Sequence, residues 1–298
     1  MKKKKRVIAL GFFDGIHIGH AALMRRTVEI GVNKALIPSV LTFDAHPLSV
    51  ICGIPVPLIN SPEDRVWLIR SGFGIDDIVS LHFGKETAGM EWVRFIEYIA
   101  YEFDVQYCVA GHDFSFGNGG EGNSDLLKQK CAGLGMGCDI IPEVKLDGVT
   151  ISSSYIRELI SDGKIGRANE FLGHPHILTG IAHNACRPGI APGTSTIILS
   201  FSESVIVPAF GVYIVKVFLC DGNEYVGVTN IGIRRADSIT GQIEAEIYVL
   251  NCLGDLDGHQ VRIEFHSYLH PATERCDHKR LKAQILHDSY AALRYFNM

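Results

Sequence analysis

Apolar residues in the first half of the chain alternate between two spacings. Continuous runs such as residues 6–13 (RVIALGFF) are typical of strands buried on both faces, whereas residues 20–31 (HAALMRRTVEIG) have the apolar spacing of a helix that Gly31 would end. This alternation predicts βαβ units and an α/β domain built on a mainly parallel sheet. Further strands are expected at 35–43, 76–83, 105–111 and 138–144, and further helices at 61–72, 90–103 and 124–135.

The pattern changes after about residue 178. Strand-like segments then follow one another without a helix until residues 279–296, and turns such as CDGNE separate several of them. This pattern predicts a small antiparallel β-barrel with a C-terminal helix. Since glycine, proline and histidine interrupt residues 172–180, we place the boundary there, which gives domains of residues 1–178 and 179–298. The expected barrel strands are 195–201, 211–220, 223–233, 243–250 and 259–269.

The composition limits which classes of partner the chain is expected to bind. The net charge of −5 and the pI of about 6.2 disfavour a nucleic-acid binder, because such domains are usually basic. The eight cysteines form no C-x-x-C pair, which disfavours a zinc or redox motif and indicates buried thiols in a reducing, cytoplasmic compartment.

The N-terminal lysines precede a short apolar run. This run stops at Asp14 without a small-residue cleavage site, so it predicts a first buried strand rather than a secretory signal. No run approaches 18 apolar residues, and we therefore expect no membrane partner.

Two histidines, His17 and His20, lie where the first strand should pass into the first helix. A helix that begins at the carboxyl end of a parallel strand directs free backbone N–H groups at a phosphate, and Gly19 would allow a close approach. The imidazoles could then donate hydrogen bonds to phosphate oxygens as charge builds up in a transition state. The alternative is structural, with one histidine packing and the other capping the helix. Asp14 could orient a histidine, contact a nucleotide or cap a turn.

Residues 152–157 (SSSYIR) provide a second set of phosphate-binding groups. The hydroxyls of Ser152 and Ser153 lie at an expected helix start, and Arg157 follows one turn later. A helix N-terminus and a guanidinium can together hold phosphate oxygens. An ordinary serine cap is the alternative.

Four blocks in order resemble the prokaryotic FAD synthetase family of the nucleotidylyltransferases. They are GFFDGIHIGHAAL (11–23), LTFDAHPLSVI (41–51, with Ala45 for the usual proline), AGHDFSFGNGGEGNSDLL (110–127) and ISSSYIRELISDGKIGRANEFLG (151–173). The resemblance implies that residues 1–178 form a Rossmann-like domain that transfers AMP from ATP to FMN, giving FAD and pyrophosphate. It implies small-molecule partners only, with ATP and FMN as substrates and Mg²⁺ as cofactor.

The resemblance also implies the site residues. His17, His20 and Arg157 would be catalytic, and no side chain is assigned as a metal ligand. For Asp44, a turn cap is an alternative role, and for His46, packing. The expected substrate-binding residues are Gly11, Phe13, Asp14, Gly19, Asp44, His46, Asp113, Phe114, Asn123, Ser152 and Ser153.

The glycines of residues 117–122 also satisfy G-x-G-x-x-G, and Asp139 follows at about the spacing that a dinucleotide-binding motif has for its acid. In a dinucleotide-binding fold that acid should end the second strand, whereas Asp139 would begin a strand. We therefore expect a mobile loop over the flavin or nucleotide instead of a NAD site.

Residues 179–298 partly resemble the riboflavin kinase module of the same family. Glu246 aligns with the glutamate that serves as general base, and Thr196 with a nucleotide-loop threonine, but Ile198 stands where that loop has a metal-binding asparagine. Because isoleucine offers no oxygen to Mg²⁺, we predict that kinase activity is absent or very weak and that the chain is a monofunctional FMN adenylyltransferase. A bifunctional enzyme and a flavin-binding protein without catalysis are the alternatives.

Overall fold

The chain forms two compact units in a computed structural model. One contains residues 1–58 and 62–153, and the other residues 59–61 and 154–298. The structure describes residues 4–185, 194–202, 204–233, 243–252, 254–272 and 278–298. This division follows from compactness alone. The boundary expected near residue 178 separates two functional domains, and it stays a prediction.

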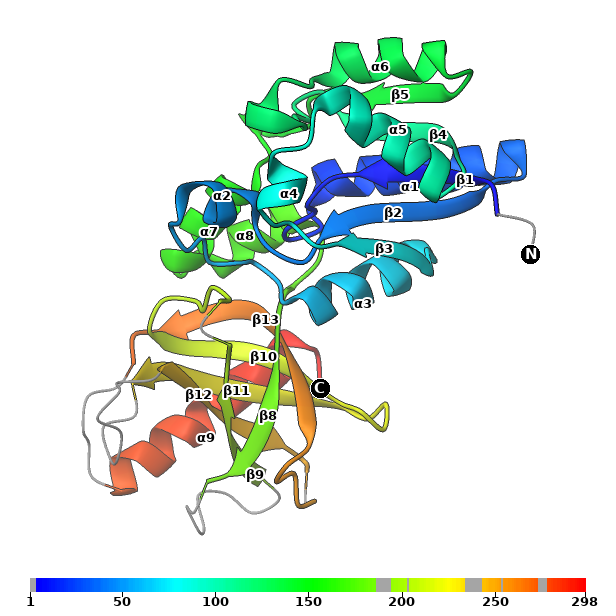
Figure 1. The fold of residues 1–298 in the computed structure, drawn as a ribbon. Coiled ribbons are helices and arrows are strands. Elements are labelled where there is room, and N and C mark those ends of the chain that lie inside the picture. Colours follow the sequence, from blue (N-terminus) through cyan, green and yellow to red (C-terminus); the bar gives the residue numbers. More distant parts are fainter. Residues whose placement is uncertain (1–3, 186–193, 203, 234–242, 253, 273–277) are drawn as a thin grey trace. The chain divides into compact units, whose positions relative to one another are not determined.

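A five-stranded parallel sheet forms the first unit, with the strand order β3-β2-β1-β4-β5 (Figure 1). Because β1 lies in the middle, the chain adds β2 and β3 on one side and then crosses to β4 and β5 on the other. In such sheets ligands bind beyond the carboxyl ends of the strands where the order reverses, here between β1 and β4. The strands are β1 Arg6–Leu10, β2 Ile37–Phe43, β3 Asp77–Leu81, β4 Val105–Gly111 and β5 Gly137–Ile141.

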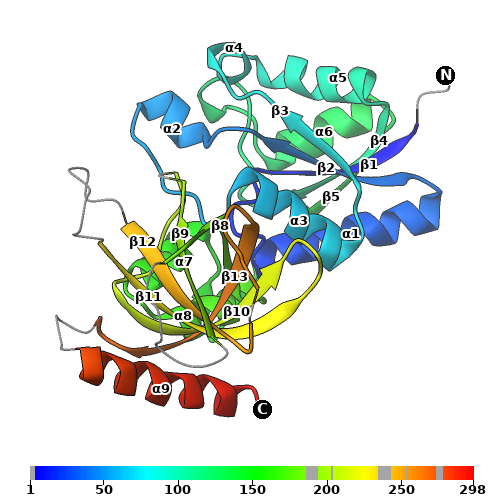
Figure 2. The same ribbon diagram turned by 90° about the horizontal axis from the view of Figure 1, so that it is seen from below.

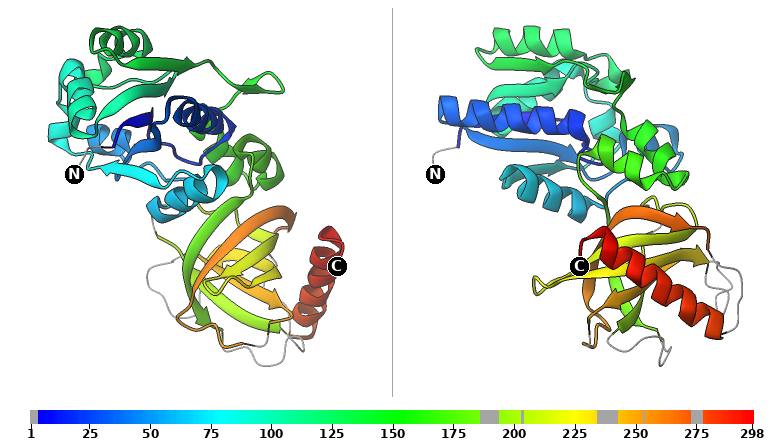
Figure 3. Two further views of the ribbon diagram at one scale, coloured as in Figure 1. Left: turned by 90° about the vertical axis from the view of Figure 1, so that its right-hand side faces the viewer. Right: turned by 180° about the vertical axis from the view of Figure 1, so that it is seen from behind.

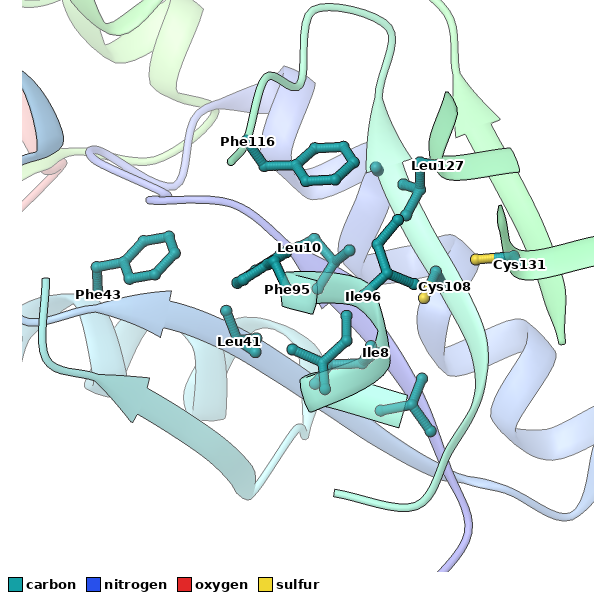
Figure 4. Close-up of a cluster of buried hydrophobic side chains, with 13 residues drawn as sticks. Ile8, Leu10, Leu41, Phe43, Phe95, Ile96, Cys108, Phe116, Leu127 and Cys131 are labelled. Atoms are coloured by element: carbon teal, nitrogen blue, oxygen red, sulfur yellow. The ribbon is translucent and has the colours of Figure 1, made fainter. Parts of the chain in front are cut away.

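Helices cover both faces of this sheet (Figure 2). One face carries α1 (Ile18–Lys34), which packs on β1, β2 and β4 and contacts α3 (Pro62–Phe73). The other face carries α5 (Trp92–Glu102) and α6 (Ser124–Gly133). The predicted α/β class is thereby confirmed. The core under α5 and α6 includes Ile8, Leu10, Leu41, Phe95, Ile96, Cys108, Leu127 and Cys131 (Figure 4).

We expected the first helix to end at Gly31, but it does not. The helix continues to Lys34, and Ala35 follows in the left-handed conformation with φ 53°. A Cβ at Gly31 would lie 2.6 Å from Cγ of Pro38, so the glycine permits close packing of α1 on β2. The second expected helix likewise runs one residue past Gly72.

Several short elements have no counterpart in the sequence analysis. They are α2 (Pro47–Cys52), α4 (Lys85–Ala88) and a 3-10 turn at Asn118–Gly120. A hairpin of β6 (Lys145–Leu146) and β7 (Val149–Thr150) is also present, and left-handed Asp147 and Gly148 form its turn.

The second unit is a closed antiparallel barrel with strand order β10-β11-β12-β9-β8-β13 (Figure 3). The barrel and the C-terminal helix α9 (His278–Tyr295) are as predicted, but β8 was not expected as a strand. Two helices precede the barrel in the chain, α7 (Ser153–Ser161) and α8 (Ile165–Leu172). The barrel strands are β8 His176–Asn184, β9 Thr194–Ser200, β10 Gly211–Leu219, β11 Glu224–Ile233, β12 Ile243–Leu250 and β13 Gln260–His270.

The cysteines only partly follow the expectation that they are buried. Cys108, Cys131 and Cys252 are buried free thiols, whereas Cys52 and Cys220 are exposed. Cys186 and Cys276 lie outside the described residues.

None of the helices in the described ranges combines the length and apolar character needed to cross a bilayer.

Candidate active site

The loop between β1 and α1 has an unusual backbone. Phe13 and Ile16 have φ angles of 61° and 43°, and Gly15 between them has 85°. Left-handed conformations are unfavourable for bulky side chains, so the surrounding structure must hold this loop in place. Gly11 allows part of this arrangement, because a Cβ there would come within 2.9 Å of the Phe13 ring.

His17 caps the N-terminus of α1. Its Nδ1 accepts a hydrogen bond from the backbone N–H of His20 at 3.2 Å. Because a backbone N–H can only donate, Nδ1 carries no proton and the imidazole proton lies on Nε2. A Cβ at Gly19 would come within 3.1 Å of the His17 ring, which explains the glycine. The capping alternative and the donor role are therefore compatible, since the cap leaves His17 with an N–H at Nε2.

His20 stacks on His17. The two ring centroids are 3.5 Å apart at an interplanar angle of 15°, and the His20 ring meets the edge of Phe13 at 5.2 Å. Burial, followed by the proximity of His17 and Arg65, holds the pKa of His20 well below its usual value. His20 is thus neutral near pH 7 and has one imidazole N–H to donate. Within the described part of the chain, the buried Nδ1 of His20 has no hydrogen-bond partner.

The start of α7 meets the same loop. The Ser153 hydroxyl donates to the backbone carbonyl of Asp14 at 2.9 Å, while Asp14 itself is buried. Ser152 directly precedes the helix, and Arg157 lies four residues beyond Ser153, about one turn along it. The structure therefore places the start of α7 next to the loop that carries the two histidines.

Asp44 and His46, after β2, make local contacts. Asp44 accepts hydrogen bonds from the Phe83 amide at 2.9 Å and from Nδ1 of His82 at 2.8 Å. Partial burial raises the pKa of Asp44, but these bonds outweigh it and leave the pKa below its usual value. His46 caps α2 through the N–H of Leu48 and packs edge-on against Phe12. The contacts of Asp44 are those of a turn cap, which was the alternative role for this residue. His46 packs against Phe12, which was the alternative role for that residue.

Arg65, on α3, was not singled out in the sequence analysis. Its guanidinium donates to the carbonyls of Phe12 at 2.7 Å and Phe43 at 2.8 Å, and it stacks on the Phe12 ring at 4.5 Å. The residue is 2% exposed, and burial lowers its pKa although Asp14, Glu63 and Asp44 act against this. One buried cation therefore joins the loops that follow β1 and β2. The sequence of this helix does not distinguish Arg65 from Arg70, which follows five residues later.

We expect Arg65→Met to lower the free energy of unfolding by about 2–4 kcal/mol, because two carbonyls lose a charged donor. Any reaction at the histidine loop should slow as well, since this loop loses its anchor. Denaturant unfolding and a steady-state assay check this. Arg70→Met is the matched control on the exposed side of α3, with an expected change within about 0.5 kcal/mol. Equal effects of the two substitutions would contradict the anchoring role.

The loop after β4 carries the next group of expected site residues. The Asp113 side chain is 83% exposed, and Phe114 stacks on Phe116 at 5.2 Å. Asn123 caps α6 by accepting from the N–H of Leu126 at 3.0 Å. The glycine segment is closed by a bridge between Phe116 and Gly122. These contacts are internal to the loop, which lies beyond the carboxyl end of the strand next to β1.

Asp139 lies in the middle of β5, not at its start as expected. It accepts hydrogen bonds from the Tyr107 hydroxyl at 2.7 Å and from Nε of Arg26 at 2.6 Å. The structure thus gives it a clear role in joining α1, β4 and β5.

A second set of expected residues lies on the barrel. In the antiparallel register, Glu246 of β12 is opposite Ile198 of β9, and Tyr248 is opposite Thr196. The Ser195 hydroxyl donates to the Cys252 carbonyl at 2.8 Å. Ile198 therefore lies directly beside the candidate base, where it offers only an aliphatic surface. The preceding residues of the expected nucleotide loop, 187–193, lie outside the described residues.

Two family models match this chain. Residues 1–155 match the model described as FAD synthetase, and residues 172–296 match the one described as riboflavin kinase. A bifunctional riboflavin kinase/FMN adenylyltransferase of Bacillus subtilis is 31% identical over 300 residues, covering 99% of this chain and 94% of the relative. The protein of the same name from Escherichia coli strain K12 is 29% identical, with 98% and 93% covered.

One solved structure is similar along nearly the whole chain. It is described as the crystal structure of a macrolide-efflux protein from Streptococcus pneumoniae, with a TM-score of 0.85 and 24% identity. The similarity covers 98% of this chain and 95% of that one. At this identity it supports the fold alone.

Proposed function

Because the chain belongs to the FAD synthetase family, we propose that it is an FMN adenylyltransferase, which transfers AMP from ATP to FMN and releases pyrophosphate. One observation carries the proposal. At the β1–α1 junction, the imidazoles of His17 and His20 are stacked beside a helix N-terminus, and a lowered pKa keeps His20 neutral. This is where an open parallel sheet binds its ligand, and the arrangement suits a phosphate that gains charge.

The reaction is a direct displacement at the α-phosphorus of ATP. A phosphate oxygen of FMN forms the new P–O bond, and the bond to the bridging oxygen of the β-phosphate breaks, so pyrophosphate leaves with the electron pair. Since the FMN phosphate is already an anion, the attacking group needs no base. His17 would donate from Nε2 to the oxygens of the α-phosphate, and His20 would donate its single imidazole N–H.

The leaving pyrophosphate needs separate contacts. Ser152 would hold its oxygens at the N-terminus of α7, Ser153 would do so once its hydroxyl leaves the Asp14 carbonyl, and Arg157 would neutralise the charge. Gly19 would allow a phosphate to approach the backbone closely, and His46 would contact phosphate. The other expected residues would contact the adenosine or flavin groups: Gly11, Phe13, Asp14, Asp44, Asp113, Phe114 and Asn123.

Mg²⁺ fits this proposal as a part of the substrate. In the described ranges, no three His, Cys, Asp or Glu side chains converge as a metal site. Mg²⁺ in such enzymes is typically held by substrate phosphates with few protein ligands, and it neutralises charge on the phosphates. We therefore expect it to enter with ATP.

The comparisons favour the bifunctional alternative over the monofunctional enzyme that the sequence analysis preferred. The riboflavin kinase model matches residues 172–296, and the relatives that cover nearly the whole chain are named bifunctional. We therefore propose that the barrel phosphorylates riboflavin, with Glu246 as the base. The monofunctional reading keeps one observation in its favour, the aliphatic Ile198 beside Glu246.

Product analysis tests both activities. The chain is incubated with ATP and Mg²⁺ and either FMN or riboflavin, and the flavins are separated by chromatography. We expect FAD and pyrophosphate from FMN, and FMN followed by FAD from riboflavin. Failure to form FAD from FMN would refute the adenylyltransferase. Formation of FAD from FMN without any product from riboflavin would restore the monofunctional reading.

A further inference from the structure

Three adjacent barrel strands place Asn230, Glu246 and Ile198 in one row. Asn230 on β11 is opposite Glu246 on β12, which is opposite Ile198 on β9. Directly opposed residues of antiparallel strands point to the same face of a sheet. Their chain neighbours Ile231, Ile247 and Leu199, which point the other way, are fully buried. The row therefore lies on the outer wall of the barrel.

The amide oxygen of Asn230 is the unusual feature of this row. Oδ1 is buried, and within the described residues it has no hydrogen-bond partner. A buried acceptor without a donor carries a desolvation penalty, so such atoms in a folded protein need an explanation.

Its neighbours in the row cannot supply the missing proton. On one side lies Val212 of β10, which is apolar, and on the other lies Glu246, which is an acceptor when ionised. Ile198, the next residue along, is also apolar. The missing donor must therefore come from outside this row, and a hydroxyl group of a ligand at Glu246 would fit.

Riboflavin carries several neighbouring hydroxyls on its ribityl chain. On the proposed kinase function, on which this step rests, Glu246 takes the proton of the terminal hydroxyl as that oxygen bonds to the γ-phosphorus and ADP leaves. A second hydroxyl of the same chain would then lie beside the adjacent strand. We infer that Oδ1 of Asn230 accepts a hydrogen bond from such a ribityl hydroxyl and so helps to select a flavin that carries the chain.

Two flavins separate this contact from a general loss of structure. Riboflavin has the ribityl chain, whereas lumiflavin has a methyl group in its place. We expect Asn230→Leu to weaken riboflavin binding to the full-length chain by about 5- to 150-fold, the equivalent of about 1–3 kcal/mol, and to leave lumiflavin binding within twofold. Fluorescence titration measures both, and the KM for riboflavin should rise in parallel.

Asn223→Leu is the matched control. Asn223 lies in the turn before β11, where its side chain donates to Asp221 at 2.7 Å, and it is seven residues from Asn230. Its riboflavin affinity should stay within twofold of the unsubstituted chain. An unchanged riboflavin affinity in Asn230→Leu would overturn the inference, and so would an equal loss for lumiflavin.

Failure of the kinase proposal looks different. In that case neither the unsubstituted chain nor Asn230→Leu forms FMN from riboflavin. The binding ratio between riboflavin and lumiflavin still decides the role of Asn230.

Discussion

Replacing His20 with alanine should lower the kcat of FAD formation by about 10²–10³-fold, the effect of removing one donor from a site where charge develops. The reason is geometric. His20 stacks on His17 at the β1–α1 junction, and its depressed pKa keeps it a neutral N–H donor near pH 7. The thermal midpoint should change little, because the His17 cap of α1 uses the backbone of His20 and survives the substitution. Steady-state kinetics with FMN and thermal unfolding check the two parts.

His259→Ala is the control, since this histidine is exposed in the other unit. It should leave kcat within about twofold. Near-normal FAD formation by His20→Ala would count against the phosphate-binding role. A large loss of stability together with the loss of rate would show that His20 packs the loop rather than binding substrate.

The sheet was predictable because each of its strands is an apolar run separated by a helical pattern. The boundary strand β8 was not, since its start follows the glycine, histidine and proline of residues 173–175 and looks like an interruption. The predicted helix end at Gly31 was wrong for another reason. Local sequence favours a helix end at glycine, whereas the close approach of Pro38, which explains this glycine, exists only in the folded unit. The β6–β7 hairpin did have a signal, the Asp147-Gly148 pair typical of a two-residue turn.

The arrangement of the candidate site was predictable only in part. His17 and His20 follow from their spacing at a strand end, and Ser153 from its place at a helix start. Arg65 could not be found in the same way, because its partners are two backbone carbonyls that only the fold brings together. The same holds for Asn230, whose significance depends on the register that places it opposite Glu246.

The second large effect concerns the barrel. Glu246→Gln should lower riboflavin phosphorylation by about 10²–10⁴-fold, since a glutamine amide cannot take the proton of the ribityl hydroxyl. The substitution keeps the size of the side chain, so the pairing of β12 with β9 and β11 should persist. FMN formation from riboflavin and ATP measures the effect, while FAD formation from supplied FMN verifies that the chain is folded.

Glu224→Gln provides the comparison, because Glu224 forms an ion pair with Lys216 on the same barrel and lies six residues from Asn230 along β11. Phosphorylation should stay within about twofold in that variant. The result also bears on Ile198. If the unsubstituted chain makes FMN, then Mg²⁺ is held without a side-chain oxygen from position 198, and other oxygens, such as those of the phosphates, take its place. If both variants phosphorylate riboflavin equally, the base lies elsewhere and the alignment of Glu246 with a catalytic residue is wrong.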